Sequence, residues 1–253
     1  MCLILIAHRA HPAYPLVVGA NRDEFYGRPT APAHFWEDAP KVLAGRDLQA
    51  SGTWLGISRD LRFAAVTNFR DMRSMQPGAR SRGELTSEFL RGHETAERYL
   101  DGVSRRASEY SGFNLFVADS TGLFYFSNRD GEVRKLRPGT YGLSNHLLDT
   151  PWPKVAELKP RFSAAIAEPL NPDAIRKLLA DRGLAPDAAL PDTGVGLERE
   201  RMLSAAFVIS ETYGTRSTTV LSVGANRAVR FHEWSYGPGG APVGEREFTF
   251  TAD

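Results

Sequence analysis

The sequence has very little cysteine and almost no net charge. Only Cys2 carries a thiol among 253 residues, which excludes an internal disulfide and any zinc or iron–sulfur site with several thiolate ligands. Lysine and arginine number 31 against 30 acidic residues, a formal net charge of +1. Because this balance offers no general attraction to nucleic acid or to an anionic membrane, we expect neither as a partner.

Long apolar runs are also missing. The apolar run at the start covers residues 1–7 and is followed by His8, far short of the ~20 residues that a membrane-spanning helix needs. The run also lacks the charged leader and the small-residue cleavage site of a secretory signal. We therefore expect a cytoplasmic protein with no integral membrane segment.

Familiar cofactor and hydrolase motifs are absent as well. The sequence contains no Gly-Lys-Ser/Thr phosphate loop, no dinucleotide glycine fingerprint, no His-Glu-x-x-His and no Gly-x-Ser-x-Gly. Its six histidines show no metal-ligand spacing beyond His8 and His11, which flank a turn. We therefore expect no metal site and no required cofactor.

Apolar periodicity predicts strands at both ends of the chain and helices in the middle. Residues 2–8 and 16–20 predict a hairpin, and four strands are predicted from residue 206 onward. The prolines of residues 25–40 predict a loop. Helices are predicted over 81–90 with a Ser81–Glu84 capping box, over 95–108, and over 151–180 with a break or kink at Pro160. This grouping favours α+β layers in a single domain, 1–253, over an alternating doubly wound fold.

Cys2 is the first candidate for chemistry because of its position. Methionine aminopeptidases generally remove Met1 when the second residue is small, and the thiol and a free α-amine would then belong to one residue. An α-amine has a pKa of about 7.7–8.0 and can act as a general base near neutral pH, while the thiolate is the nucleophile. Such a residue defines an N-terminal nucleophile hydrolase. The alternative is that Cys2 is a small buried apolar residue of a strand.

The polar run Asn21-Arg22-Asp23-Glu24 directly follows the second predicted strand. If the first two strands pair as a hairpin, the end of the second lies beside the start of the first, and Asn21, Arg22 and Asp23 come close to Cys2. Asp23 could then hold the α-amine, and Arg22 could stabilise a thiolate or an oxyanion. The alternative is a solvated turn.

Several distinctive sequence blocks occur in order from residue 1 to about residue 220. They are Met1-Cys2, Asn21-Arg-Asp-Glu-Phe-Tyr-Gly-Arg-Pro29, Ser51-Gly-Thr-Trp-Leu-Gly-Ile-Ser58, Ala65-Val-Thr-Asn68, Ser81-Arg-Gly83 and Tyr141-Gly-Leu-Ser-Asn145. Together these blocks resemble one known family, the NRDE or transport and Golgi organisation protein 2 family.

The resemblance implies a four-layer αββα fold of antiparallel sheets, similar to the choloylglycine hydrolase and penicillin V acylase group. That group uses an N-terminal cysteine, an aspartate after the second strand, asparagine oxyanion donors and a late arginine. The matching residues here are Cys2, Asp23, Asn68 or Asn145, and Arg216. One position departs from the acylases, which carry an arginine three residues before the aspartate where this chain has Ala20.

Three further residues of these blocks are candidate binding residues: Asn21, Trp54 and Arg82. For Trp54, which lies between two nearby glycines, the alternative is a core strand residue with close backbone packing. For Arg82, at the first turn of a predicted helix, the alternative is a structural or solvated side chain.

Two functions follow from the resemblance. The first is hydrolysis of a linear amide or thioester through Cys2, with a small acyl compound as substrate. The second is a non-catalytic carrier that uses the same cleft, in haem trafficking or in lipid and acyl-CoA homeostasis. Haem would then be a ligand without a c-type attachment site, because the sequence has no Cys-x-x-Cys-His.

Overall fold

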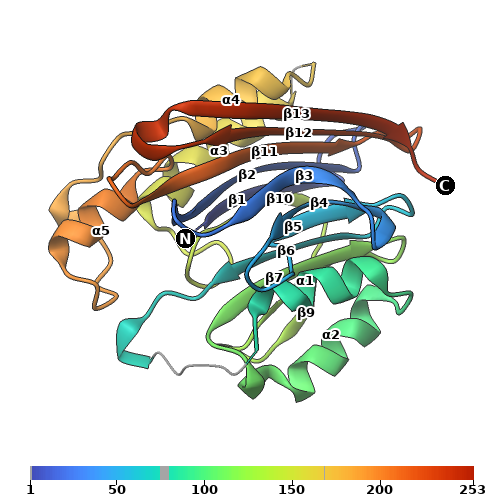
Figure 1. Cartoon of the computed structure of the whole chain (residues 1–253), viewed down its shortest axis with the longest axis horizontal. Coiled ribbons are helices and arrows are strands. Elements are labelled where there is room, and N and C mark those ends of the chain that lie inside the picture. The colour runs from blue at the N-terminus through green and yellow to red at the C-terminus, as the bar shows by residue number, and fades with distance from the viewer. Residues whose placement is uncertain (1, 75–79, 168) are drawn as a thin grey trace. The chain divides into compact units, whose positions relative to one another are not determined.

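The protein, a computed structural model that describes residues 2–74, 80–167 and 169–253, divides into two compact units. Unit 1 comprises Met1–Gly27, Asp71–Ser74 and Pro138–Thr251, and unit 2 comprises Arg28–Arg70, Met75–Arg137 and Ala252–Asp253. Each unit has one antiparallel sheet and helices of its own (Figure 1). The prediction of an α+β fold with antiparallel sheets is confirmed, while the single domain over 1–253 stays a prediction.

The sheet of unit 1 has six strands in the order β10-β1-β2-β11-β12-β13. Every neighbouring pair is antiparallel. The strands are β1 (Cys2–His8), β2 (Leu16–Phe25), β10 (Gly139–Leu143), β11 (Tyr213–Val223), β12 (Ala228–Tyr236) and β13 (Pro242–Thr251). The first of the four strands predicted from residue 206 onward covers residues 206–210, and of these only Ile209 pairs, in an isolated bridge to Gly214.

The predicted hairpin of β1 and β2 is confirmed, but β2 is longer than expected. It continues through Asn21, Arg22 and Asp23 to Phe25 instead of ending at Ala20. These polar residues stay in the strand because β2 lies between β1 and β11, so that backbone partners are present on both sides. Both strands are buried on both faces along most of their length, which explains the unbroken apolar run of β1.

Helices α3 (Pro153–Ala167) and α4 (Pro172–Leu179) pack on the sheet of unit 1, and α5 (Leu197–Ser204) precedes β11. The apolar side chains of α3 and α4 share a core with alternate residues of β1, such as Leu3 and Leu5. Of the break or kink expected at Pro160, the break is wrong, because α3 continues through this residue, and the kink stays a prediction. Pro160 and Ala156 are both exposed, so water can hydrogen-bond the Ala156 carbonyl that the proline leaves without an N–H partner.

The sheet of unit 2 has seven strands in sequence order from β3 to β9. They are β3 (Thr30–Trp36), β4 (Ala39–Asp47), β5 (Leu55–Ser58), β6 (Phe63–Asn68), β7 (Phe113–Asp119), β8 (Gly122–Ser127) and β9 (Val133–Lys135). The loop expected over 25–40 is therefore wrong, since β3 and the start of β4 occupy most of it. Pro32 is tolerated because β3 is the edge strand of the sheet.

Helices α1 (Arg82–Arg91) and α2 (Ala96–Arg105) belong to unit 2, where α1 contacts four of its strands. The expected capping box is wrong, because the Ser81 side chain makes no cap hydrogen bond and the Glu84 carboxylate accepts instead from the Tyr110 hydroxyl at 2.6 Å. Short 3₁₀ turns complete the described elements at Met72–Ser74, Ala107–Glu109, Asp187–Ala189 and Pro238–Gly240.

Two of the sequence blocks meet in unit 2 through their glycines. A Cβ added to Gly52 would lie 2.5 Å from the carbonyl carbon of Gly83, closer than any real Cβ contact. The Thr53 N–H donates to the Gly83 carbonyl at 3.2 Å across the same contact. Gly52 is thus required for the start of α1 to approach this segment. No helix among the described residues is long and apolar enough to cross a membrane.

Candidate active site

Cys2 opens β1 in the interior of unit 1. Its Cα lies opposite that of Arg22 on β2, as the predicted hairpin requires, and the residue is only 8% exposed. The Cys2 backbone nitrogen donates a hydrogen bond to Asn145 Oδ1 at 3.3 Å. Asn145 follows β10, the other neighbour of β1, so the sheet itself brings the two residues together.

The surroundings of the Cys2 thiol act on its pKa in opposite directions. Burial is the largest effect and raises the pKa, and the nearby charge of Asp23 raises it further. The charge of Arg22 and a hydrogen bond from the Asp23 backbone lower it, but the net shift is upward. The resting thiol therefore keeps its proton near neutral pH.

Asp23 is a buried carboxylate held by named partners. Its Oδ1 accepts a hydrogen bond from the Thr215 hydroxyl at 2.7 Å. Burial raises the pKa of Asp23, and although the charge of Lys154, the Thr215 hydrogen bond and the charge of Arg22 lower it, the net shift is upward. Lys154 is itself 5% exposed, and its Nζ also donates to the Ala205 carbonyl at 3.3 Å. Asp23 therefore lies in a buried environment that contains a compensating cation.

The Thr215 hydroxyl has a fixed orientation because the Val208 N–H donates to its oxygen at 2.9 Å. The hydroxyl proton is then directed to Asp23, which is the arrangement that an ionised carboxylate favours. Tyr213 holds the backbone of the same aspartate, since its hydroxyl donates to the Asp23 carbonyl at 3.1 Å. Both partners come from the first residues of β11.

Two arginines lie beside this cluster. Arg22 is 7% exposed and forms an ion pair with Glu24 at 3.5 Å, while its Nη1 has no hydrogen-bond partner among the described residues. Arg216 occupies a bulge of β11 between Thr215 and Ser217, and its Nη1 donates to the Phe25 carbonyl at 3.1 Å. Burial and the charge of Arg22 lower the pKa of Arg216, so the two guanidiniums are near neighbours.

Asn21 is held at the centre of unit 1. Its Nδ2 donates to the carbonyls of Leu179 and Ala206, each at 2.8 Å, and its Oδ1 accepts from the Thr218 hydroxyl at 2.7 Å. The side chain is completely buried. These three bonds give Asn21 a structural task, and its role in binding stays a prediction.

The remaining predicted residues belong to unit 2. Asn68 is the exposed last residue of β6. Trp54 is half-buried and packs against the core of unit 2. Arg82 opens α1 and donates to the Gly112 carbonyl at 3.3 Å. Unit 1 thus brings together Cys2, Arg22, Asp23, Asn145 and Arg216, and the roles of the three unit 2 residues stay predictions.

Sequence reasoning missed Thr215, Tyr213 and Lys154. The first two lie close to Arg216 in sequence but have no distinctive spacing from Asp23. Lys154 offers a usable signal, because it lies in the first turn of α3, where the positive end of the helix dipole disfavours a cation. A lysine in that position indicates that a nearby acidic group offsets the cost.

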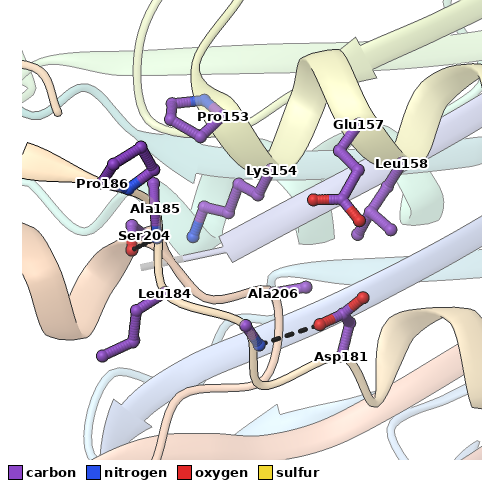
Figure 2. A pocket seen from close by; sticks show the side chains of 11 residues that line it. Pro153, Lys154, Glu157, Leu158, Asp181, Leu184, Ala185, Pro186, Ser204 and Ala206 are labelled. Carbon is purple, nitrogen blue, oxygen red and sulfur yellow. Dashed lines mark hydrogen bonds between the residues drawn. The ribbon is translucent and has the colours of Figure 1, made fainter. Parts of the chain in front are cut away.

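Lys154 also lines a cavity of about 210 Å³ in unit 1 (Figure 2). The walls come from α3, the segment after α4 and the end of α5. They are formed by Pro153, Lys154, Glu157, Leu158, Asp181, Gly183, Leu184, Ala185, Pro186, Ser204 and Ala206. Within the described ranges, no group of three or more His, Cys, Asp or Glu side chains is placed to hold a metal ion.

Comparison with known proteins identifies the family. Residues 1–238 match the family model described as Transport and Golgi organisation 2. The chain belongs to the Transport and Golgi organisation 2 family. A mouse member, named Transport and Golgi organization 2 homolog, is 40% identical over 257 residues, and the match covers 93% of each chain. The Drosophila melanogaster Transport and Golgi organization protein 2 is 27% identical over 264 residues, covering 92% of this chain and 91% of the relative.

A solved structure places this member of the Transport and Golgi organisation 2 family in a fold class. The Caenorhabditis elegans ortholog of N-acylethanolamine-hydrolyzing acid amidase superposes with a TM-score of 0.52 at 12% sequence identity, covering 87% of this chain and 92% of that chain. At this identity the likeness concerns the fold alone. The expected N-terminal nucleophile hydrolase-like fold is confirmed.

Proposed function

We propose that this family member hydrolyses a linear amide or thioester through Cys2 once Met1 has been removed. The observation that carries the proposal is the hydrogen bond between the Cys2 nitrogen and Asn145 Oδ1, in a cluster that also contains Asp23 and Arg22. A thiol, its own amine, a buried carboxylate and a guanidinium are the groups that such a reaction needs.

The chemistry assigns one task to each group. The neutral α-amine of Cys2 takes the thiol proton as the sulfur attacks the substrate carbonyl, so a raised thiol pKa is compatible with the resting state. Arg22 Nη1 and the Asn145 side-chain amide stabilise the negative oxygen of the tetrahedral intermediate. The resulting ammonium returns its proton to the leaving amine or thiol, and a thioester remains on Cys2. Water, deprotonated by the same amine, then releases the carboxylic acid.

Asp23 stabilises the ammonium form of the Cys2 amine during this cycle. A buried carboxylate is effective in that task because little water screens its charge. Thr215 and Lys154 support the proposal, since both favour the ionised form of Asp23 against the effect of burial. The amidase named among the fold neighbours is consistent with amide chemistry but does not supply the substrate of this chain.

Intact mass spectrometry with an electrophilic acyl probe tests the proposal. We expect the purified protein to lack the mass of Met1 and to gain one acyl group. We expect Cys2→Ala to gain none, and because Cys2 is the sole cysteine, no other thiol can contribute. Asn145→Ala should retain the free amino terminus and label more slowly. A chain that retains Met1 and stays unlabelled would contradict the proposal.

One observation favours the alternative of a non-catalytic carrier. The Cys2 thiol is buried and its pKa is raised, which suits a side chain that lines a binding site without reacting. Haem or an acyl compound would then be the ligand. A haemin titration followed in the Soret region tests the haem case, since a saturable shift supports it and an unchanged spectrum removes it.

A further inference from the structure

The cavity lined by Lys154 has a positively charged side chain at one end and two carboxylates at the other. Figure 2 shows the Lys154 side chain extending from α3 toward Ala185, whereas the carboxylates of Glu157 and Asp181 lie at the other end. Arg161 Nη1 pairs with both carboxylates, at 2.8 Å to Glu157 and 3.0 Å to Asp181, and offsets their negative charge. The lysine end is therefore the end at which an anion is attracted.

The walls next to the ammonium are mostly apolar. Figure 2 shows Pro153, Ala185, Pro186 and the polar Ser204 at the lysine end, whereas Leu158 lies beside Glu157 at the other end. Leu184, a further residue of the lining, is 62% exposed. A buried ammonium among apolar walls fits a ligand with one anionic group and a short hydrocarbon body.

Lys154 links this cavity to the candidate active site. Its ammonium donates to the Ala205 carbonyl, and its charge lowers the pKa of Asp23. A ligand carboxylate in the cavity would compete with Asp23 for the same positive charge. A ligand bound in the cavity would therefore change the effect of the Lys154 charge on Asp23, the carboxylate beside Cys2.

We propose that this cavity binds a short-chain carboxylate, which pairs with Lys154 and weakens the support that Lys154 gives to Asp23. The effect on catalysis rests on the proposed function, whereas the binding does not. The proposed hydrolysis also releases a carboxylate. A product of this reaction would therefore belong to the class of ligand that the cavity binds.

Binding is tested by calorimetric titration of the full chain with hexanoate, hexanamide and hexylamine. We expect saturable binding of hexanoate, weaker binding of hexanamide and none of hexylamine. Lys154→Met and Ala185→Phe should each weaken hexanoate binding at least tenfold, the first by removing the charge and the second by filling the cavity. Lys159→Met, on the same helix, and Ala189→Phe, in an exposed turn, are the matched controls and should bind as the parent does.

The possible outcomes separate the two proposals. Hexanoate should bind Cys2→Ala as tightly as it binds the parent. Binding to the cavity is therefore tested even if Cys2 never reacts. In a parent protein that labels, hexanoate should slow acyl labelling, and the same concentration should not slow it in Ala185→Phe. Preference for hexylamine, or equal hexanoate binding by the parent and Ala185→Phe, would overturn the carboxylate site.

Discussion

The Thr215 hydroxyl lies 2.7 Å from Asp23 Oδ1 and joins two strands that are almost two hundred residues apart in sequence. Asp23 belongs to β2 and Thr215 to the neighbouring β11, where their Cα atoms are register partners. The threonine also accepts the Val208 N–H, so one hydroxyl satisfies both a buried carboxylate and a buried backbone donor.

Replacing Thr215 with valine should therefore destabilise the protein. The change keeps the shape of the side chain but leaves Asp23 Oδ1 and the Val208 N–H without this partner, at a cost of about 1–3 kcal/mol for a buried group. Urea unfolding measures the loss. Thr219→Val is the matched control on the same strand, because the Thr219 hydroxyl is buried and makes no hydrogen bond to any described residue. Equal losses in the two variants would contradict the role given to Thr215.

Alkylation of Cys2 should have a pH midpoint above the usual value for a free cysteine, about 8.5. Burial raises the thiol pKa, and iodoacetamide reacts with the thiolate, so the rate should still be rising at that pH. Arg22→Met should raise the midpoint further because the charge of Arg22 lowers the pKa. Arg230→Met, which changes an exposed arginine of β12, should leave it unchanged. A midpoint at or below that of free cysteine would contradict this account.

The buried carboxyl of Asp23 should make stability depend on pH. Because its folded pKa is raised, the native state binds this proton more tightly than the unfolded state. Its contribution to stability is therefore fully present below the unfolded pKa, about 3.9, and is lost as the pH rises through the folded pKa. The difference in unfolding free energy between the parent and Asp23→Asn should fall over that window and then level off. A difference that is constant with pH would show that the carboxyl is not perturbed.

The contact between Gly52 and Gly83 should tolerate no added methyl group. Gly52→Ala places a Cβ against the backbone at the start of α1, which cannot move as a flexible side chain can. We expect a loss of about 1–3 kcal/mol in the unfolding free energy, as for other overpacked sites. Gly27→Ala is the control, since nothing lies within 4 Å of its added Cβ. A neutral Gly52→Ala would mean that α1 can shift at little cost.

Local sequence patterns were sufficient to predict the part of the site that is formed by two strands consecutive in sequence. The apolar runs of residues 2–8 and 16–20 predicted the hairpin that places Cys2 opposite Arg22. Asn145 and Arg216 could be selected only through the family resemblance, because β10 and β11 join the hairpin from distant parts of the chain. Lys154 and Thr215 were missed for the same reason, since their partner Asp23 is distant in sequence.

The errors in the fold also have physical causes. The prolines of residues 25–40 predicted a loop, but β3 is an edge strand and Pro32 lies at an irregularity of its pairing with β4, between Ala31 and His34. The Ser81–Glu84 pair had the spacing of a capping box, but Tyr110 binds the glutamate from elsewhere in unit 2. Each error arose where a tertiary contact replaced the local interaction that the sequence pattern assumed.

The position of β1 between β2 and β10 also sets the order of events during synthesis. β2 follows β1 after a short turn, but β10 begins only at Gly139, so the second neighbour of β1 is made much later. Once both have paired, the Cys2 nitrogen is held by Asn145 in the interior of the sheet. The hydrogen bond from the Cys2 nitrogen can therefore form only after Asn145 has been synthesised, when more than half of the chain has left the ribosome's catalytic centre.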